Sequence, residues 1–478
     1  ATLDAMWLGG MHDHIGGGFQ RYSTDAEWLL PHFEKMLYDN AQLIRSYTDG
    51  YQITGNERFR EAVADIYGWV RREMTSPEGA FYSALDSGEV GQEGEAYVWR
   101  MERLTEVLND EDAALFAMVY GFKPEGNFQE EATGERSGKN IPHLQQPIES
   151  LRHPAGAEKP DPALRLADIR SRLLAERRTW PQPRRDDKIL TSWNGLLIGS
   201  LAYAGRVLDE PDYVQAAGTA ADDILNRLVR DDRLLRTCRN GSARLPGYLD
   251  DYVFLTQGLL ELYLATEDSR WLDQARRFAT ILVRDFEDKQ NGGFFYTSAD
   301  HEELMFRSRN FGGGGNMPNS NGIASQVLLR LANLTDNPAW RVSAVRTLES
   351  LSGLMATQPH SSEHLLIAAS QYLAESDDRS VDDGLTRRVA PLAFYIRGPA
   401  SGVQPGERVT IEIEIDIDEG WHLYAENPQA EFLIPSTVTV TAGEPLTVGS
   451  IEAPESQSKT DPILNKTVNT YSGRIRFV

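Results

Sequence analysis

Ionisable side chains crowd one segment, residues 31–43, that also carries an apolar stripe at helical spacing. Such groups are costly to bury in an ordinary core unless each is satisfied, so we expect a helix that lines a polar cavity. Lys35 and Asp39 are four residues apart and can pair on one face of that helix. We assign His32 and Glu34 as candidate acid–base residues and Asp39 as a substrate contact. The alternative is a buried capping and salt-bridge network.

Acidic pairs precede two further apolar segments. Asp186, Asp187 and Lys188 come shortly before Trp193 and Asn194, and Asp250 and Asp251 open a later segment. Two carboxylates about 5 to 10 Å apart can hydrolyse a glycosidic bond, and Trp193 offers a flat surface for a sugar. Asp187 is therefore the third candidate catalytic residue, although each aspartate could instead only cap its helix. The candidate substrate contacts here are Lys188, Trp193, Asn194, Asp250 and Asp251.

Two glycine-rich loops add two further candidate contacts. His12 and His14 flank Asp13, but no third ligand follows at a diagnostic spacing, so we assign no metal and take His12 as a substrate contact. Gly312–Gly315 precede Asn321 without the lysine of a phosphate loop. Asn321 is therefore taken as a substrate contact, and no nucleotide or other cofactor is expected.

The overall composition limits the kind of protein this chain can be. Its 478 residues fit two or three domains. Acidic residues outnumber basic ones by 71 to 48, a net charge of −23 that argues against a nucleic-acid partner. Cys238 is the only cysteine, which excludes an intrachain disulfide. No apolar run is long enough to span a membrane. We expect a soluble protein and lean toward the cytoplasm, while the compartment stays open.

The elements that position these residues show a repeated helix–turn–helix unit. Its second helix opens with an aromatic residue followed four positions later by a small apolar one. These pairs are Phe59/Val63, Tyr213/Ala217, Trp271/Ala275 and Trp340/Ala344. Successive units lie 58 and 69 residues apart between Tyr213, Trp271 and Trp340, which exceeds the 34 to 47 residues of helical solenoids. The spacing favours a closed (α/α) toroid with its site at the loop end.

We expect the inner helices of this toroid to begin near His32, Thr191, Leu249, Pro318 and His360, with their polar starts at one end. Residues 121–160 are predicted to form a long loop across the barrel. Residues 409–417 alternate at period two, as a half-buried strand does. The predicted organisation is a barrel at 1–375, a linker at 376–388 and a β-sandwich at 389–478.

Several motifs resemble the YyaL / spermatogenesis-associated thioredoxin-like family over residues 1–375. The segments that carry the resemblance are 9–43, 95–99, 138–140, 186–195, 249–252 and 292–295. The resemblance implies a mainly α, six-hairpin glycosidase-type (α/α) toroid and a thioredoxin-like domain upstream of this chain. Asn321 matches the family, whereas Gly314 and Asn319 depart from its pattern.

The C-terminal part resembles the N-terminal domain of DsbD-type thiol-disulfide interchange proteins. Residues 420–425, 433–436 and 471–473 carry this resemblance, which implies an immunoglobulin-like β-sandwich. We expect the domain to be truncated, with the family's cysteines lying beyond the chain.

Two functions remain open from the sequence. The first is an enzyme whose barrel binds or processes a carbohydrate-type substrate, through the glycoside hydrolysis or sugar epimerisation that the superfamily resemblance implies. The alternative is a non-enzymatic scaffold that presents a partner to the upstream thioredoxin-like domain. A perturbed carboxyl or imidazole in a pocket would favour the enzyme, and a broad exposed apolar patch would favour the scaffold.

Overall fold

The computed structural model describes most of the chain in two compact units. The described residues are 1–89, 93–130, 134–151, 161–301, 306–309, 315–335, 337–379, 385–389, 392–397, 408, 410–418, 421–429, 433, 435–438, 449–461 and 466–478. Contacts between residues separate a unit at 1–369 from one at 370–478. Residues 312–314 of the glycine-rich loop and Val409, at the start of the predicted strand 409–417, lie outside the described residues.

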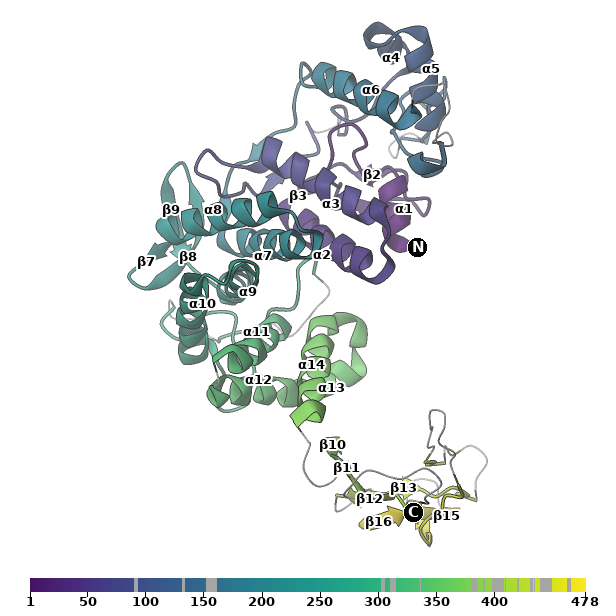
Figure 1. The fold of residues 1–478 in the computed structure, drawn as a ribbon, viewed down its shortest axis with the longest axis vertical. Helices are drawn as coiled ribbons and strands as arrows, with labels where there is room; N and C mark the ends of the chain where they lie inside the picture. The colour runs from purple at the N-terminus through teal and green to yellow at the C-terminus, as the bar shows by residue number, and fades with distance from the viewer. Residues whose placement is uncertain are drawn as a thin grey trace. The chain divides into compact units, whose positions relative to one another are not determined.

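Four helical hairpins form the body of the first unit (Figure 1). In each hairpin a first helix that is buried over much of its surface is followed by a second, more amphipathic helix. Each first helix packs against its own second helix, and neighbouring first helices pack together. The hairpins are α2 (Leu37–Thr54) with α3 (Glu57–Trp69), α7 (Thr191–Leu208) with α8 (Pro211–Arg227), α9 (Leu249–Thr266) with α10 (Ser269–Ile281), and α11 (Ser320–Thr335) with α12 (Pro338–Ser350).

Asparagine and aspartate side chains cap the second helices at three of the four turns. Asn56, Asp268 and Asn337 each accept a hydrogen bond from the backbone two residues ahead and cap their helices. The aromatic and small residues that open these helices are buried. Short π-helical turns, η1 (Val70–Met74) and η3 (Leu282–Phe286), extend α3 and α10.

Short strands precede the inner helices, where the sequence predicted helix. His32 lies in β2 (Pro31–His32), which pairs with β1 (Tyr22–Ser23). Lys35 lies in β3 (Lys35–Met36), which joins β4 (Ala84–Leu85) and β5 (Arg185–Asp186) in one sheet. The predicted helix start at His32 is therefore wrong, because pairing with distant strands keeps this segment extended until Leu37. The starts predicted at Thr191 and Leu249 are confirmed.

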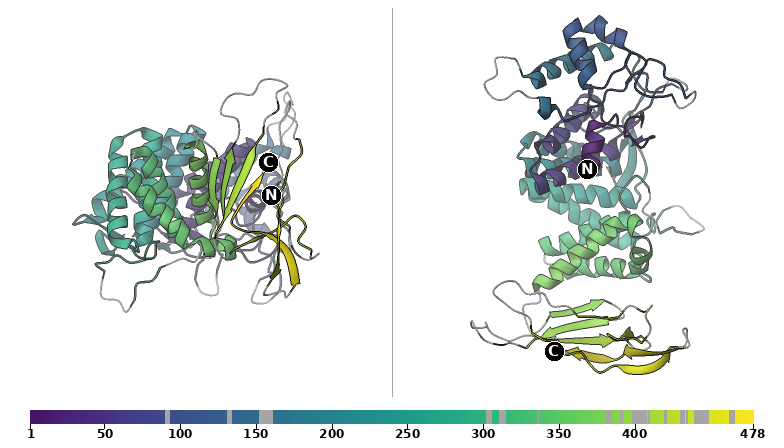
Figure 2. Two further views of the ribbon diagram at one scale, coloured as in Figure 1. Left: turned by 90° about the horizontal axis from the view of Figure 1, so that it is seen from below. Right: turned by 90° about the vertical axis from the view of Figure 1, so that its right-hand side faces the viewer.

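A smaller helical cluster covers residues 99–177 beside α1 (Thr2–Leu8), at the end of the unit away from α11 (Figures 1 and 2). It contains α4 (Met101–Val107), α5 (Asp110–Val119), η2 (Ile148–Leu151) and α6 (Pro162–Arg177). Phe122 and Leu144 pack into its apolar core with Trp99, Phe116 and Leu166. The described part of residues 121–160 thus folds against these helices and does not cross the barrel, because its apolar side chains are buried there.

The first unit continues through α13 (Ser352–Thr357) and η4 (Pro359–Ser361) into α14 (Glu363–Arg379). A Cβ atom at Gly322 would lie 2.6 Å from the backbone of His364, so a glycine lets α11 and α14 approach closely. The inner helix predicted near His360 begins at Glu363. Of the linker predicted at 376–388, residues 376–379 lie in α14 and 385–388 in a strand, and 380–384 lie outside the described residues.

The described strands of the second unit form two antiparallel sheets. One has the strand order β10 (Leu385–Val389), β11 (Leu392–Arg397), β12 (Glu412–Ile417), β16 (Arg474–Phe477), and the other β13 (Leu423–Tyr424), β15 (Lys466–Tyr471), β14 (Gln457–Asp461). Ile415 and Phe477 of the first sheet share an apolar core with Tyr471 of the second. This packing is that of a β-sandwich. The predicted class, helical hairpins with a C-terminal β domain, is confirmed.

The strands that complete the hairpin region are β6 (Ile189–Leu190), β7 (Val229–Arg230), β8 (Arg233–Arg239) and β9 (Ser242–Pro246).

None of the described helices is long and apolar enough to cross a membrane.

Candidate active site at the starts of the inner helices

The starts of the four inner helices contact one another in a closed circuit. α2 contacts α7, α7 contacts α9, α9 contacts α11, and the residue four positions before α11 returns to α2. The rings of Tyr38 and Trp193 lie with their centroids 4.7 Å apart, and the Ser192 N–H donates to Asp251 at 3.0 Å. Ser320 donates to Asp250, and the Asn316 amide donates to the Tyr38 hydroxyl at 3.1 Å. These contacts bring four of the five predicted helix starts together.

Asparagine side chains hold this end together. Asn40 of α2 accepts from the Phe19 N–H at 2.8 Å and donates to the Phe19 carbonyl at 3.0 Å. Asn194 binds both backbone groups of Phe81 in the same way, and Asn321 those of Phe294. All three asparagines are fully buried. These backbone groups occupy the amides of Asn194 and Asn321, whose predicted substrate contacts stay predictions.

His32, Glu34 and Arg21 form a half-exposed network on the strands before α2. The Glu34 carboxylate accepts from Arg21 at 3.0 Å and lies 3.1 Å from the Nε2 atom of His32. The His32 ring stacks on Tyr22, with the two planes 12° apart. Side-chain exposures of 27 to 32% leave His32, Glu34 and Arg21 open to a ligand.

Asp39 lies in the first turn of α2, where the charges of Arg21 and Glu34 act on its carboxyl group. Burial, with the negative charge of Glu34, raises the pKa of Asp39 to about 7 against the opposing charge of Arg21. Its Oδ2 atom is buried and has no hydrogen-bond partner among the residues that the structure describes. Asp39 can therefore both release and accept a proton near neutral pH.

Asp250, in the first turn of α9, lies beneath an aromatic surface. Its carboxylate accepts from Ser320 and from the Tyr296 hydroxyl, the latter at 3.2 Å. Burial raises the pKa of Asp250. The Tyr296 ring stacks on Tyr248 at 5.1 Å, and the His301 ring stacks on the same tyrosine at 5.5 Å. Asp250 can thus orient a hydroxyl group beside a flat aromatic surface.

Asp251 instead caps its own helix. It accepts hydrogen bonds from the backbone N–H groups of Ser192 and Tyr248, and Arg236 lies 3.3 Å away. Burial raises the pKa of Asp251 to about 6, although Arg236 opposes this shift. The side chain is fully buried. Asp251 therefore caps its helix, as the alternative reading of the sequence held, and its predicted substrate contact stays a prediction.

Lys35 and His12 lie beneath the site in buried networks. The Lys35 ammonium donates to Asp13 and to the Gly17 carbonyl, both at 2.7 Å. The predicted pairing of Lys35 with Asp39 is wrong, because a distant carboxylate takes the ammonium. His12 lies 2.9 Å from Asp65 and stacks on Trp7 at 4.0 Å. His12 is buried in this network, and its predicted substrate contact stays a prediction.

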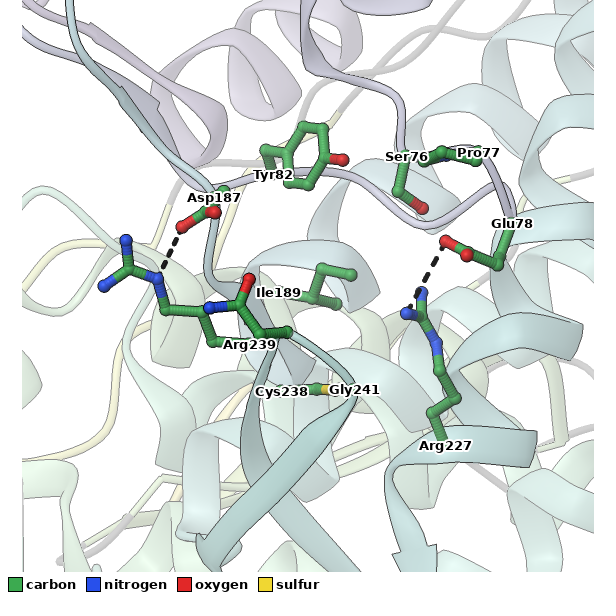
Figure 3. Close-up of a pocket in the computed structure, with 11 residues that line it drawn as sticks. Ser76, Pro77, Glu78, Tyr82, Asp187, Ile189, Arg227, Cys238, Arg239 and Gly241 are labelled. Atoms are coloured by element: carbon green, nitrogen blue, oxygen red, sulfur yellow. Dashed lines mark hydrogen bonds and ion pairs between the residues drawn. The ribbon is translucent and has the colours of Figure 1, made fainter.

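Asp187 and Lys188 do not join the other predicted residues. Asp187 forms an ion pair with Arg239 at 2.6 Å and lines a separate polar cavity of about 190 Å³ (Figure 3). Glu78 and Arg227 lie across this cavity from Asp187 (Figure 3). Lys188 pairs with Asp186 at 3.0 Å. No hydrogen bond or ion pair between described residues joins Asp187 to His32 or Glu34, so their joint catalytic role stays a prediction.

Three residues of the site were missed from the sequence. Arg21, Tyr38 and Tyr296 each contact a predicted site residue, yet none stands at a spacing that indicates it. The neighbouring glycine–phenylalanine pairs at 18–19 and 293–294 were a usable signal. Each forms the bridge that an inner-helix asparagine holds. The described residues contain no group of three or more His, Cys, Asp or Glu side chains arranged to hold a metal ion.

Comparisons with known proteins identify relatives of both parts of the chain. Spermatogenesis-associated protein 20 of Rattus norvegicus is 33% identical over 386 residues, which cover 75% of this chain and 49% of that protein. An uncharacterised protein of Caenorhabditis elegans is 29% identical over 398 residues, covering 78% of this chain and 54% of that protein. The chain spans about half the length of the curated relatives it matches.

Solved structures with low sequence identity also align. The cellobiose 2-epimerase of Bacillus thermoamylovorans has a TM-score of 0.45 at 8% identity, over 72% of this chain and 68% of that one. A D-mannose isomerase has a TM-score of 0.37 at 13% identity, over 73% and 84%. Residues 398–478 match the family model of the N-terminal part of the thiol:disulfide interchange protein DsbD. The chain is thus similar to spermatogenesis-associated protein 20 over three quarters of its length, and its residues 398–478 are similar to the N-terminal part of DsbD.

Proposed function

We propose that the helical unit binds a carbohydrate at the starts of its inner helices and moves a proton on it. Asp39 carries this proposal, because its carboxyl titrates near pH 7 beside the half-exposed Glu34 and His32. Two acidic groups in unlike surroundings can divide the tasks of donating and accepting a proton. Glu34 is held by Arg21 and His32, whereas Asp39 has the raised pKa of a proton donor.

The surroundings of these groups suit a sugar. Trp193 is half-buried against Tyr38 and presents an aromatic face at the start of α7. Asp250 and Tyr296 supply polar groups for hydroxyls at the start of α9. Aromatic side chains with a few convergent polar groups are typical of small-molecule sites. Glycoside hydrolysis and epimerisation of a free sugar both need such a proton donor and acceptor.

The test is turnover of a panel of aryl glycosides and free reducing sugars by the purified chain. We expect one substrate to be converted, with a rate that falls as pH rises above about 7 because Asp39 loses its proton. Asp39→Asn should reduce that rate by a factor of 100 or more. Asp273→Asn, on the exposed face of α10, removes the same charge and should leave the rate unchanged. Absence of both turnover and sugar binding would refute the proposal.

The alternative, a scaffold for a thioredoxin-like domain, requires a broad apolar surface. The large apolar side chains exposed among the described residues are spread over many elements, from Ile53 in α2 to Trp421 in the C-terminal unit. Single exposed apolar residues are normal on a soluble protein. The raised pKa of the Asp39 carboxyl therefore favours an enzyme over a scaffold.

A further inference from the structure

A second cavity, of about 280 Å³, lies beside Tyr97 and has an unusual charge. Four arginines and one glutamate are among its lining residues. The chain as a whole carries a net charge of −23, whereas the charged side chains that line this cavity are mainly positive. The arginines are Arg72, Arg177, Arg178 and Arg185, and the glutamate is Glu73.

Buried ion pairs form the floor of this cavity. Arg177 is buried and donates two hydrogen bonds of 2.8 Å to the carboxylate of Asp13. The Lys35 ammonium, also buried, binds the same carboxylate at 2.7 Å. Two cations thus share one anion, which leaves a positive charge under the cavity. The Arg177 guanidinium also lies over the Tyr97 ring, 5.4 Å from its centroid.

The acidic lining residue is already paired. Glu73 accepts from the Arg72 guanidinium at 2.8 and 3.0 Å. Its backbone carbonyl accepts from Arg185 at 3.0 Å, and Arg185 also stacks on the Tyr82 ring at 4.2 Å. Across the described parts of the chain, Arg178 and Arg185 form no ion pair with a carboxylate. Two guanidinium groups on the rim are therefore left for a ligand.

We propose that this cavity binds the oxyanion group of a small molecule, a phosphate or a carboxylate, between Arg178 and Arg185 above Arg177. Planar guanidinium groups match such oxyanions through paired N–H donors. The volume exceeds that of a bare phosphate and admits a sugar-sized body beside Tyr97. The lining residues come from η1, β4, β5 and the end of α6 with its neighbouring loops, and include none of the groups proposed for proton transfer.

The test is calorimetric titration of the chain with inorganic phosphate, acetate, glucose 6-phosphate and glucose. We expect saturable binding of an oxyanion and no binding of glucose at this cavity. The double variant Arg178→Gln/Arg185→Gln changes only exposed side chains, so it should fold normally and bind at least tenfold more weakly. Arg184→Gln, an exposed neighbour outside the lining, serves as the control and should bind as the native chain does.

The results that would overturn the proposal are distinct from failure of the proposed function. Equal binding by the double variant and the native chain, or no saturable binding of any oxyanion, would refute the site. Binding only to a polyanion such as an oligonucleotide would refute the small-molecule class. Turnover of neutral sugars needs none of these arginines. A failure to bind oxyanions would therefore not change the effect expected of Asp39→Asn on turnover.

Discussion

Asn40, Asn194 and Asn321 occupy equivalent places in three inner helices and perform one task. Each side chain satisfies the N–H and the C=O of a buried phenylalanine in the loop that leads toward the site. In α9 the hydroxyl of Tyr252 takes this place and accepts from the Leu234 N–H at 3.1 Å. Backbone groups buried without a partner are costly, so these side chains set where the loops meet the barrel.

Removing one of these amides should destabilise the fold. Asn194→Ala leaves the buried backbone N–H and C=O of Phe81 unpaired, and we expect a loss of roughly 2 to 4 kcal/mol in the free energy of unfolding. Denaturation in urea, with the midpoint and slope both fitted, measures the loss. Asn226→Ala, on the exposed side of α8, should change stability by less than about 0.5 kcal/mol. Equal midpoints for the two variants would contradict the structural role.

Asp13 should make the stability depend on acid. Burial alone would raise its pKa, but the charges of Arg177 and Lys35 hold the pKa well below 3.8. A carboxyl with a depressed folded-state pKa contributes stability that is complete above its unfolded pKa and is lost as pH falls through the folded value. Asp13→Asn should therefore lose about 3 to 5 kcal/mol near pH 7, because two buried cations keep no counter-ion.

The pH dependence distinguishes this charge from a packing effect. The difference between the native chain and Asp13→Asn should stay constant from pH 7 to about 5 and shrink below pH 4. Urea denaturation of both proteins over that range measures it. Asp168→Asn, a largely exposed carboxylate on α6, is the control and should show almost no difference. A difference that does not vary with pH would contradict the assignment.

Residue types at local spacing indicated candidate residues of the site but not their partners. Asp39 and Asp250 were found because they sit in the first turns of helices whose period is visible in the sequence. Lys35 was paired with Asp39 by the same rule, yet its partner is Asp13, 22 positions upstream. Asn194 and Asn321 looked like ligand contacts because a single sequence does not reveal the backbone groups that use their amides.

At the scale of elements, the inner helices also meet through a charge cluster. Glu261 of α9 is 1% exposed and lies 3.1 Å from Arg45 of α2 and 2.9 Å from Arg330 of α11. Arg206 of α7 approaches the same carboxylate at 3.8 Å. Each of the four inner helices thus supplies one member. The charges of Arg330 and Arg45 hold the pKa of Glu261 below its usual value despite burial, which would raise it.

This cluster should be worth more than a surface pair. Glu261→Gln is expected to lower the free energy of unfolding by about 2 to 4 kcal/mol. A double-mutant cycle with Arg330→Gln should give a coupling energy above about 1 kcal/mol. The exposed pair Arg276 and Asp273 on α10, at 3.7 Å, provides the matched cycle and should couple by less than about 0.5 kcal/mol. Equal couplings in the two cycles would show that the cluster does not join the helices.

The elements were predictable wherever the hydrophobic period alone decides the structure. Thr191 and Leu249 begin helices as expected, since each follows a short extended segment and opens an apolar run. The segment before Leu37 has the same apolar period, but β3 pairs with β4, about 50 residues later in the chain. That tertiary pairing overrides the local propensity. The path of residues 121–151 was likewise decided by an apolar core that local composition does not reveal.

At the scale of the whole molecule, the chain contains two separately packed units. The helical unit has its own buried core, and the β unit gathers Ile415, Tyr471 and Phe477 in another. A helical period followed by a period of two indicates such a division in the sequence, and the bounds predicted for barrel, linker and sandwich stay predictions. The sequence placed the change near residue 376, whereas the contacts place it at 369/370, within α14. The difference arises because α14 continues past the last residue that packs in the helical unit.

Separate cores predict separate folding. A protein ending at Arg379 keeps the packing of His364 on Gly322, and residues 385–478 keep both sheets of the β unit. We expect each piece to unfold cooperatively, with circular dichroism showing helix in the first and strand in the second. The midpoints should lie within a few degrees of the two transitions of the whole chain, because domains with their own cores unfold as units. A helical piece that loses its cooperative transition, while the whole chain melts in one step, would mean that the β unit stabilises the barrel.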